Sequence, residues 1–179
     1  METTTLAAGC FWCTEAIFKR LKGVESVVSG YSGGDMENPS YHRVSEGTTG
    51  HAEAIQIKFD PKIISYEKLL EVFFKLHDPT SKNQQGADIG TQYRSMVFYH
   101  DEGQRKVAEK VKEDLNSKAY QGKIVTEIAP FKNFFPAEGY HQEYYEKNRT
   151  AGYCTVVIDP KITKLYKEFG EDVKEEYKK

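Results

Sequence analysis

The spacing of hydrophobic positions divides the chain into strands and helices that alternate along the sequence. Residues 53–60 form the clearest strand, because Ile55, Ile57 and Phe59 fall on one face. Shorter apolar runs predict further strands at residues 3–8, 24–31, 95–99, 124–128 and 154–158. Helical spacing predicts helices at residues 14–21, 66–77, 102–118 and 160–169.

The connections between these elements vary too much in length for a regular doubly wound sheet. We therefore expect an α+β fold, with a mixed, largely antiparallel sheet and two or more helices packed on it. No repeat or linker marks a domain boundary, and 179 residues suit a single domain over residues 1–179. The last ten residues are mostly charged, and we expect them to be frayed.

Composition and charge exclude several functional classes. The chain is 39% hydrophobic and 29% charged, which is typical of a soluble globular protein. Its net charge of -2 gives no reason to expect nucleic acid or an anionic membrane as partner. No apolar run approaches the ~20 residues that span a bilayer, and the N-terminus lacks a secretion signal. Three cysteines do not make a structural disulfide framework, so we expect reduced thiols in a cytoplasmic protein.

The junction between the first predicted strand and the first helix holds the clearest candidate for chemistry. It reads Gly9-Cys10-Phe11-Trp12-Cys13, and Trp12 is the only tryptophan of the chain. A cysteine at such a junction lies beside free backbone N–H groups and the positive end of the helix dipole, which favour thiolate over thiol. The sequence therefore predicts an activated sulfur nucleophile beside an apolar cage.

Glu53 is a candidate proton donor, but the sequence leaves two interpretations of it open. It has the same strand parity as Ile55 and Ile57. If it is buried on that apolar face, its pKa is raised and it donates a proton near neutral pH. If the strand begins later, Glu53 is solvated and ordinary.

Other motifs support weaker hypotheses. Gly30-Tyr31-Ser32-Gly33-Gly34 lacks the lysine and hydroxyl residue of a phosphate loop, and a turn that needs positive φ explains it better. Cys10 and Cys13 have no second Cys or His pair at ligand spacing, so we expect no metal. The loop at residues 88–94 is long enough to suggest binding, whereas the aromatic segment 131–145 suggests core packing.

Six motifs, spread from residue 6 to about residue 165, together resemble one known family. They are Gly9-Cys10-Phe11-Trp12, Gly30-Tyr31-Ser32-Gly33-Gly34, Asn38-Pro39-Ser40-Tyr41, Gly47-Thr48-Thr49-Gly50-His51-Ala52-Glu53, Asp88-Ile89-Gly90-Thr91-Gln92-Tyr93-Arg94-Ser95 and Tyr140-His141-Gln142. The set resembles the peptide methionine sulfoxide reductases of the A type. This resemblance implies a ferredoxin-like two-layer α/β plait and reduction of the S epimer of methionine sulfoxide, free or in proteins. It also implies thioredoxin as the recycling partner.

The resemblance implies a role for each matched residue. Cys10 matches the nucleophile that attacks the sulfoxide sulfur, and Glu53 matches the acid that protonates the sulfoxide oxygen. The substrate-binding matches are an aromatic wall of Phe11 and Trp12, the hydrogen-bond donors Tyr41 and Tyr93, and an ordering carboxylate, Asp88. The chemistry agrees, because a sulfoxide oxygen is a poor leaving group unless it is protonated. Oxygen transfer leaves a sulfenic acid that a second thiol condenses with, so thioredoxin or dithiothreitol is the only reductant required and no cofactor is bound.

The chain departs from the usual family pattern at Cys13, where glycine is commonest. Cys154 matches a resolving cysteine of some members, but the flexible glycine-rich tail that follows it there is replaced by an ordered-looking segment. Residues three apart on a helix have Cβ atoms about 5–6 Å apart, near the range of a disulfide. We therefore predict that Cys13 resolves the sulfenic acid on Cys10, with Cys154, or a relay through both, as the open alternatives.

Two other functions remain open at this point. A thioredoxin-like dithiol–disulfide oxidoreductase would use Cys10 and Cys13 and would need neither Glu53 nor the tyrosines. A sulfoxide- or peptide-binding module would bind without turnover. We expect a monomer that meets oxidised proteins or free methionine sulfoxide, with no nucleic acid and no membrane as partner.

Overall fold

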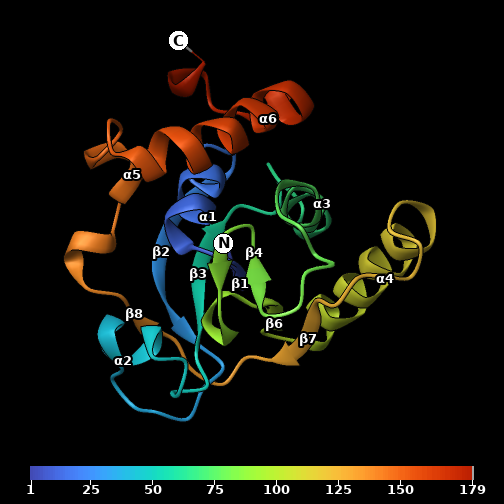
Figure 1. Ribbon diagram of the computed structural model, residues 1–179. Helices are drawn as coiled ribbons and strands as arrows, with labels where there is room; N and C mark the ends of the chain where they lie inside the picture. The colour runs from blue at the N-terminus through green and yellow to red at the C-terminus, as the bar shows by residue number, and fades with distance from the viewer. Residues whose placement is uncertain (179) are drawn as a thin grey trace.

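A six-stranded mixed sheet forms the centre of the computed structural model, which describes residues 1–178 (Figure 1). The strand order is β7-β6-β1-β3-β2-β8. The strands are β1 (Glu2–Ala8), β2 (Val24–Ser32), β3 (Ala52–Phe59), β6 (Ser95–Tyr99), β7 (Glu127–Pro130) and β8 (Phe135–Pro136). Neighbouring strands are antiparallel except for β6 and β7, which are parallel. A separate hairpin pairs β4 (Gln84–Gln85) with β5 (Asp88–Ile89). The predicted α+β class is confirmed.

The helices pack on and around this sheet. They are α1 (Phe11–Phe18), α2 (Tyr41–Ser45), α3 (Tyr66–Leu76), α4 (Glu102–Lys118), α5 (Tyr144–Lys147) and α6 (Asp159–Phe169). In Figure 1, α5 and α6 lie together beside α1 at one end of the molecule, and α4 lies at the far side. The Ser65 and Asp101 side chains cap α3 and α4 by accepting the backbone N–H groups of Lys68 and Gln104, as their positions before each helix predict.

The two faces of the sheet carry different side chains, because successive residues of a strand point to opposite faces. On one face, Leu6, Ile55, Ile57 and Phe59 are buried in the main core with α1 and α3. The opposite face carries alanines, such as Ala52, together with Met96 and Phe98, and Phe131 and Phe134 pack against it. Glu53 shares the parity of Ile55, so it lies on the face covered by helices.

Residues 154–158 do not form the predicted strand. They are a single π-helical turn, Cys154–Ile158, that continues directly into α6. The β-branched run misled the prediction, but the burial has a helical period: Cys154 and Ile158 are fully buried, whereas Val156 between them is 74% exposed. A helix with one apolar face satisfies this pattern, and no strand in the described part of the chain pairs with it.

Two other boundaries differ from the prediction. The strand expected at residues 124–128 is β7, Glu127–Pro130, which begins later because Ile124 and Thr126 belong to the preceding connection. The C-terminal segment, predicted to be frayed, packs against the end of α1. Val173 is fully buried and forms a β-bridge with Leu21, and the Lys174 N–H donates to the Arg20 carbonyl at 2.8 Å.

Candidate active site

Cys10 lies at the tight junction between β1 and α1. Its carbonyl accepts the N–H of Cys13 at 3.1 Å, so Cys10 begins the first helical turn. Gly9 before it has a φ of +85°, and a Cβ atom there would lie 2.7 Å from the Cβ of Gln85. Only glycine fits this turn. The junction therefore places the Cys10 side chain at the N-terminus of α1, as predicted, although it is only 7% exposed.

Glu53 is a buried carboxyl beside this cysteine. It is 3% exposed, and its Oε2 accepts the backbone N–H of Phe11 at 3.0 Å. Burial raises the pKa of Glu53 to about 8, against the opposing effect of that hydrogen bond. The strand begins before Glu53, so of the two interpretations the buried one holds. The carboxyl is therefore mainly protonated at neutral pH and is tied to the residue that follows Cys10.

The Cys10 and Cys13 thiols interact directly at the start of α1. Burial raises the pKa of Cys10 well above its ordinary value, and both Cys13 and the charge of Glu53 act in the same direction. The hydrogen bond with Cys10 lowers the pKa of Cys13 to about 7, and the nearby Lys161 ammonium contributes. The predicted thiolate at Cys10 is therefore wrong for the ligand-free state. Burial disfavours a charged Cys10 sulfur, whereas the interaction with Cys10 favours the charged form of Cys13.

Two phenols border Glu53. Tyr41 is the first residue of α2, and Tyr93 is the last of the 3-10 turn Thr91–Tyr93. Burial raises the pKa of both phenols, that of Tyr41 to about 12, and the Glu53 charge adds to each shift. The Glu138 carboxylate accepts the Tyr41 N–H at 3.1 Å and so fixes the start of α2. Both phenols thus stay protonated, so their O–H groups are available as donors beside the buried carboxyl.

Asp88 reaches the thiol pair through an intervening tyrosine. The Tyr153 hydroxyl donates to Asp88 Oδ2 at 2.7 Å, and the same hydroxyl lies 3.7 Å from Cys13 Sγ. This contact joins the β4–β5 hairpin to the segment that carries Cys154. Sequence reasoning missed Tyr153, because the strand predicted directly after it gave no reason to place its side chain at the site.

The aromatic residues of the first motif take different positions. Trp12 is half-buried and stacks on Tyr144, with ring centroids 3.6 Å apart and planes at 7°. Its indole N–H donates to Nδ1 of His141 at 3.0 Å. Phe11 is 1% exposed and packs against His141 from the core side. Trp12 is thus the accessible aromatic surface, while Phe11 supports it from behind.

Segment 131–145 contributes more than the packing that the sequence suggested. His141 is 1% exposed, accepts the Trp12 indole N–H, and leaves its Nε2 without a partner in the described residues. Glu138 holds Tyr41 and also accepts the Tyr31 hydroxyl at 3.0 Å. The available signal was the presence of these two polar side chains within an aromatic run.

All three cysteines lie in one apolar cluster between α1 and residues 145–162. Cys10, Cys13 and Cys154 are 7%, 1% and 0% exposed, and their thiols are free. The cluster also contains Ala16, Tyr145, Ile158 and Ile162. The structure thus brings the two candidate resolving thiols into the same apolar cluster as Cys10.

Within residues 1–178, no group of three or more His, Cys, Asp or Glu side chains is arranged to hold a metal ion. Over the same range, no helix is both long enough and apolar enough to cross a membrane.

Comparison with known proteins gives one consistent result. The peptide methionine sulfoxide reductase family matches residues 2–173. A relative from Sulfolobus acidocaldarius, peptide methionine sulfoxide reductase MsrA, is 53% identical over 171 residues, which cover 96% of this chain and 97% of the relative. The reduced form of Mxr1 from Saccharomyces cerevisiae is 41% identical and superposes with a TM-score of 0.81 over 86% of this chain and 88% of Mxr1. Mxr1 solved in complex with Trx2 is 30% identical, with a TM-score of 0.58 over 80% of this chain and 84% of that one.

A cluster of thiols beside a protonated carboxyl, on an α+β fold, is typical of a thiol-dependent oxidoreductase. Within that class, the chain belongs to the peptide methionine sulfoxide reductase family.

Proposed function

We propose that this protein reduces methionine S-sulfoxide, with Cys10 as the nucleophile and Glu53 as the proton donor. The observation that carries the proposal is the Glu53 carboxyl, which is buried, has a pKa of about 8 and is tied to the N–H of the residue after Cys10. A carboxyl that stays protonated at neutral pH suits a reaction whose leaving oxygen must first gain a proton.

The reductive step transfers the sulfoxide oxygen to the cysteine. Glu53 donates its proton to the oxygen while Cys10 sulfur attacks the sulfoxide sulfur, and the Cys10 thiol proton returns to the Glu53 carboxylate. The bond formed between the two sulfur atoms then breaks as the hydroxyl group moves from the substrate sulfur to the Cys10 sulfur. The S–O bond of the substrate is thereby lost, methionine leaves, and Cys10 becomes a sulfenic acid. The proton of the Cys10 thiol restores the Glu53 acid during this step. A Cys10 thiol that is still protonated before the attack, as its raised pKa implies, is therefore compatible with the step. Tyr41 and Tyr93 donate hydrogen bonds to the same oxygen.

The substrate side chain is held beside Trp12. Its half-buried indole, stacked on Tyr144, offers a flat surface to the S-methyl group, and sulfur–aromatic contacts contribute roughly 0.3–1.5 kcal/mol each. Phe11 backs this wall. Asp88 orders the site through its hydrogen bond with the Tyr153 hydroxyl.

The sulfenic acid is resolved within the protein. Cys13 attacks the Cys10 sulfur, a disulfide forms and water leaves. Its pKa of about 7 and its direct interaction with the Cys10 thiol support Cys13 for this role. Burial raises the pKa of the Cys154 thiol, which makes it the slower nucleophile. In the relay alternative, the Cys154 sulfur attacks the Cys13 sulfur, the Cys10–Cys13 bond breaks, a Cys13–Cys154 disulfide forms and Cys10 leaves as a thiol.

Thioredoxin is the proposed reductant of the final disulfide. The yeast relative was solved in complex with Trx2, which supports an enzyme that uses a thioredoxin. The two-electron balance is complete, because the thioredoxin dithiol becomes a disulfide as the enzyme disulfide returns to two thiols. We also propose that the protein acts as a monomer, with a single catalytic domain built on a ferredoxin-like plait of β1, α1, β2, β3, α3 and β6.

The test is consumption of NADPH by the protein with thioredoxin and thioredoxin reductase, using separated epimers of methionine sulfoxide. We expect turnover with the S epimer, none with the R epimer, and none with the Cys10→Ser variant. Turnover of both epimers at equal rates, or full activity of the variant, contradicts the proposal.

The burial of the Cys10 thiol does not favour the thioredoxin-like alternative. In that mechanism the N-terminal cysteine of the pair has a lowered pKa and attacks an incoming disulfide. Here burial raises the pKa of Cys10, and the lowered pKa belongs to Cys13. Insulin reduction without sulfoxide reduction is the result that would support the alternative.

A further inference from the structure

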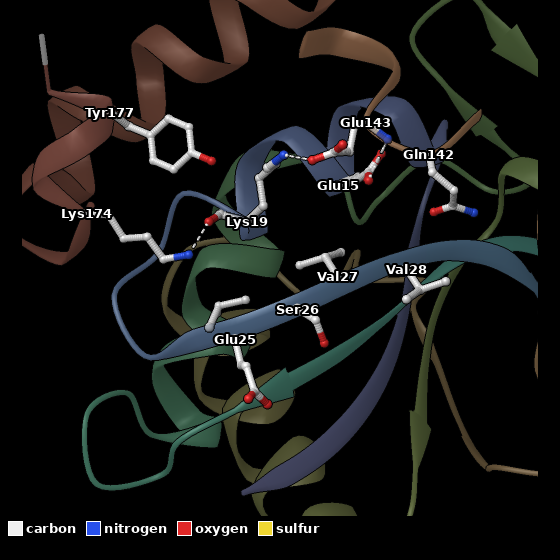
Figure 2. A pocket seen from close by; sticks show the side chains of 11 residues that line it. Glu15, Lys19, Glu25, Ser26, Val27, Val28, Gln142, Glu143, Lys174 and Tyr177 are labelled. Carbon is white, nitrogen blue, oxygen red and sulfur yellow. Dashed lines mark hydrogen bonds and ion pairs between the residues drawn. The ribbon is translucent and has the colours of Figure 1, made fainter. Parts of the chain in front are cut away.

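A groove lies between α1 and the outer edge of β2, outside the catalytic site. Its volume is about 530 Å³. Figure 2 shows α1 with Glu15 and Lys19 on one wall, the β2 residues 24–28 on the other, and Lys174 and Tyr177 of the C-terminal segment at one end. None of the steps described above uses this groove.

The β2 edge in this groove has unused hydrogen-bonding groups. β8 pairs with β2 only at Gly30 and Tyr31. At Ser29 the amide side chain of Gln142 takes the place of a neighbouring strand, because it accepts the Ser29 N–H at 2.9 Å and donates to the Ser29 carbonyl at 2.8 Å. Both groups of a strand residue point to the same side, and the side alternates along the strand. Val27, two residues earlier in the same register, therefore directs its N–H and C=O away from β3 into the groove, where no described strand pairs with it.

The groove also contains one cation without an anionic partner. The Lys174 ammonium donates to the Lys19 carbonyl at 2.8 Å, and no carboxylate within residues 1–178 pairs with it. Two of the carboxylates that line the groove are engaged elsewhere: Glu143 pairs with Lys19 at 2.8 Å, and Glu25 pairs with Lys58 at 2.7 Å. Burial lowers the pKa of Lys174 and outweighs the opposing charge of Glu176, which forms no ion pair with it within residues 1–178.

Both walls of the groove lead back to the catalytic site. α1 begins at the Cys10 junction, and β2 places Tyr31 opposite Glu53. From Cys10 to Lys19 the helix rises about 14 Å at ~1.5 Å per residue. An extended chain covers that distance in roughly four residues at ~3.3 Å each.

We propose that the groove binds the extended main chain of an oxidised polypeptide substrate as an added strand on β2, with a substrate carboxylate paired to Lys174. This rests on the proposed function and adds to it a preference for unfolded chains that carry an acidic residue four to six positions from the sulfoxide. Main-chain pairing to an exposed strand edge is a common way to bind peptides without strict sequence selection.

The test compares kcat/KM for matched peptides that contain methionine S-sulfoxide and either Asp or Asn four to six residues before or after it. With the wild-type protein we expect the Asp peptide of one series to be roughly three- to tenfold better, the range of an ordinary net hydrogen bond. The Lys174→Gln variant should reduce that ratio to near one. Lys110→Gln, an equal charge change on the exposed face of α4, should keep it. We also expect a higher kcat/KM for the peptide than for N-acetylmethionine S-sulfoxide. N-methylation of the peptide backbone at alternate residues should remove this difference.

Equal rates for Asp and Asn peptides in both series, or a ratio that survives Lys174→Gln, overturn the groove proposal. A raised KM for thioredoxin in Lys174→Gln with an unchanged peptide ratio assigns the groove to the reductant and overturns it as well. If the wild-type protein reduces neither peptides nor free sulfoxide, the proposed function fails. Fluorescence anisotropy of the same labelled peptides with Cys10→Ser then still decides whether the groove distinguishes Asp from Asn.

Discussion

The Glu53 carboxyl is buried and accepts only one hydrogen bond from the described part of the protein. A buried carboxylate normally needs several donors to remain charged, whereas a buried carboxylic acid needs few. The single N–H of Phe11 orients the group without stabilising its charge enough to lower the pKa. Its surroundings thus keep a proton next to the nucleophile.

For Glu53→Gln we predict loss of the reductive step with substrate binding retained. The rate of sulfenic acid formation should fall by roughly 10²–10⁴-fold, the usual effect of a positioned acid. In the wild type this rate should decrease as pH rises through about 8, because Glu53 loses its proton there, and the variant should lack that decrease. Single-turnover quench measurements across pH 6–10 give both results. Tyr41→Phe serves as the comparison, with a smaller loss, since Tyr93 remains; an unchanged rate in Glu53→Gln would give the residue a structural role only.

The second residue-scale prediction concerns the coupled thiols. Cys13 raises the pKa of Cys10 through its hydrogen bond and its charge, so Cys13→Ala should lower the pH at which iodoacetamide alkylates Cys10. In the wild type, alkylation should become fast only above the ~8.5 of a free thiol. The measurement is the pH profile of Cys10 alkylation by mass spectrometry. A midpoint that stays constant or rises in Cys13→Ala would show that burial alone sets this pKa.

Sequence reasoning succeeded at the residues whose roles depend on local position. Cys10 follows from the strand–helix junction, and the parity of Glu53 with Ile55 correctly placed it on the face covered by helices. Sequence reasoning failed on the direction of the Cys10 pKa shift, because the burial of Cys10 depends on how α1 packs against the segment around Cys154, about 140 positions away. The local sequence of residues 9–13 cannot predict that long-range contact.

At the scale of elements, α1 and the turn Cys154–Ile158 together form the redox part of the molecule. α1 carries two thiols on its first turn, and the π-helical turn brings the third into the same apolar cluster. Arg20, at the far end of α1, is 2% exposed and pairs with Glu146 at 2.6 Å, which ties the connection before the turn to the same helix. The prediction of a strand at residues 154–158 failed because a run of β-branched residues is compatible with a strand or with a helix. Only the spacing of its buried residues distinguishes the two.

The order of the resolving thiols can be tested with single Cys→Ser variants and one equivalent of sulfoxide. We predict that Cys154→Ser still loses two thiols per turnover, because Cys13 closes the disulfide within α1. Cys13→Ser should lose one thiol at the normal rate and accumulate the sulfenic acid, detectable with dimedone. If instead Cys154→Ser accumulates the sulfenic acid and Cys13→Ser closes a disulfide at the normal rate, Cys154 is the first resolving thiol.

At the scale of the whole molecule, the C-terminal segment completes the packing around α1. Val173 is fully buried, the Lys174 N–H donates to the Arg20 carbonyl, and the Arg20 guanidinium lies 4.6 Å from the Tyr177 ring centroid. Burial of one valine contributes about 1.5–3 kcal/mol. The high charge of this segment made it look unstructured, but one apolar residue in register with Leu21 is enough to anchor it.

We therefore predict that deletion of residues 170–179 lowers the free energy of unfolding by about 2–4 kcal/mol. Urea unfolding followed by circular dichroism measures this change. Lys178→Ala is the control, because its ion pair with Glu175 is exposed and such pairs contribute little. An unfolding midpoint equal to that of the full chain would mean that the segment packs without stabilising the fold.

The raised pKa of Glu53 also predicts a pH dependence of stability. The folded state holds this proton up to about pH 8, whereas the unfolded chain releases it near ~4.3. The contribution of the group is thus complete below pH ~4 and is lost as pH rises to about 8, by at most ~1.4 kcal/mol per unit. Glu53→Gln should therefore gain stability relative to the wild type between pH 5 and 8, as measured by urea unfolding at each pH. A constant difference across that range would contradict the buried protonated carboxyl.

The stacking of Trp12 on Tyr144 makes the tryptophan fluorescence of this protein a reporter of its redox state. Because the chain has a single tryptophan, its fluorescence comes from one indole, which lies two residues from Cys10 and stacks on the residue that opens α5. Any oxidation step that shifts the segment from Tyr144 to Cys154 changes what that indole touches. Sulfenic acid formation, disulfide closure and reduction can then be followed in real time as successive changes in emission, without a dye or a label.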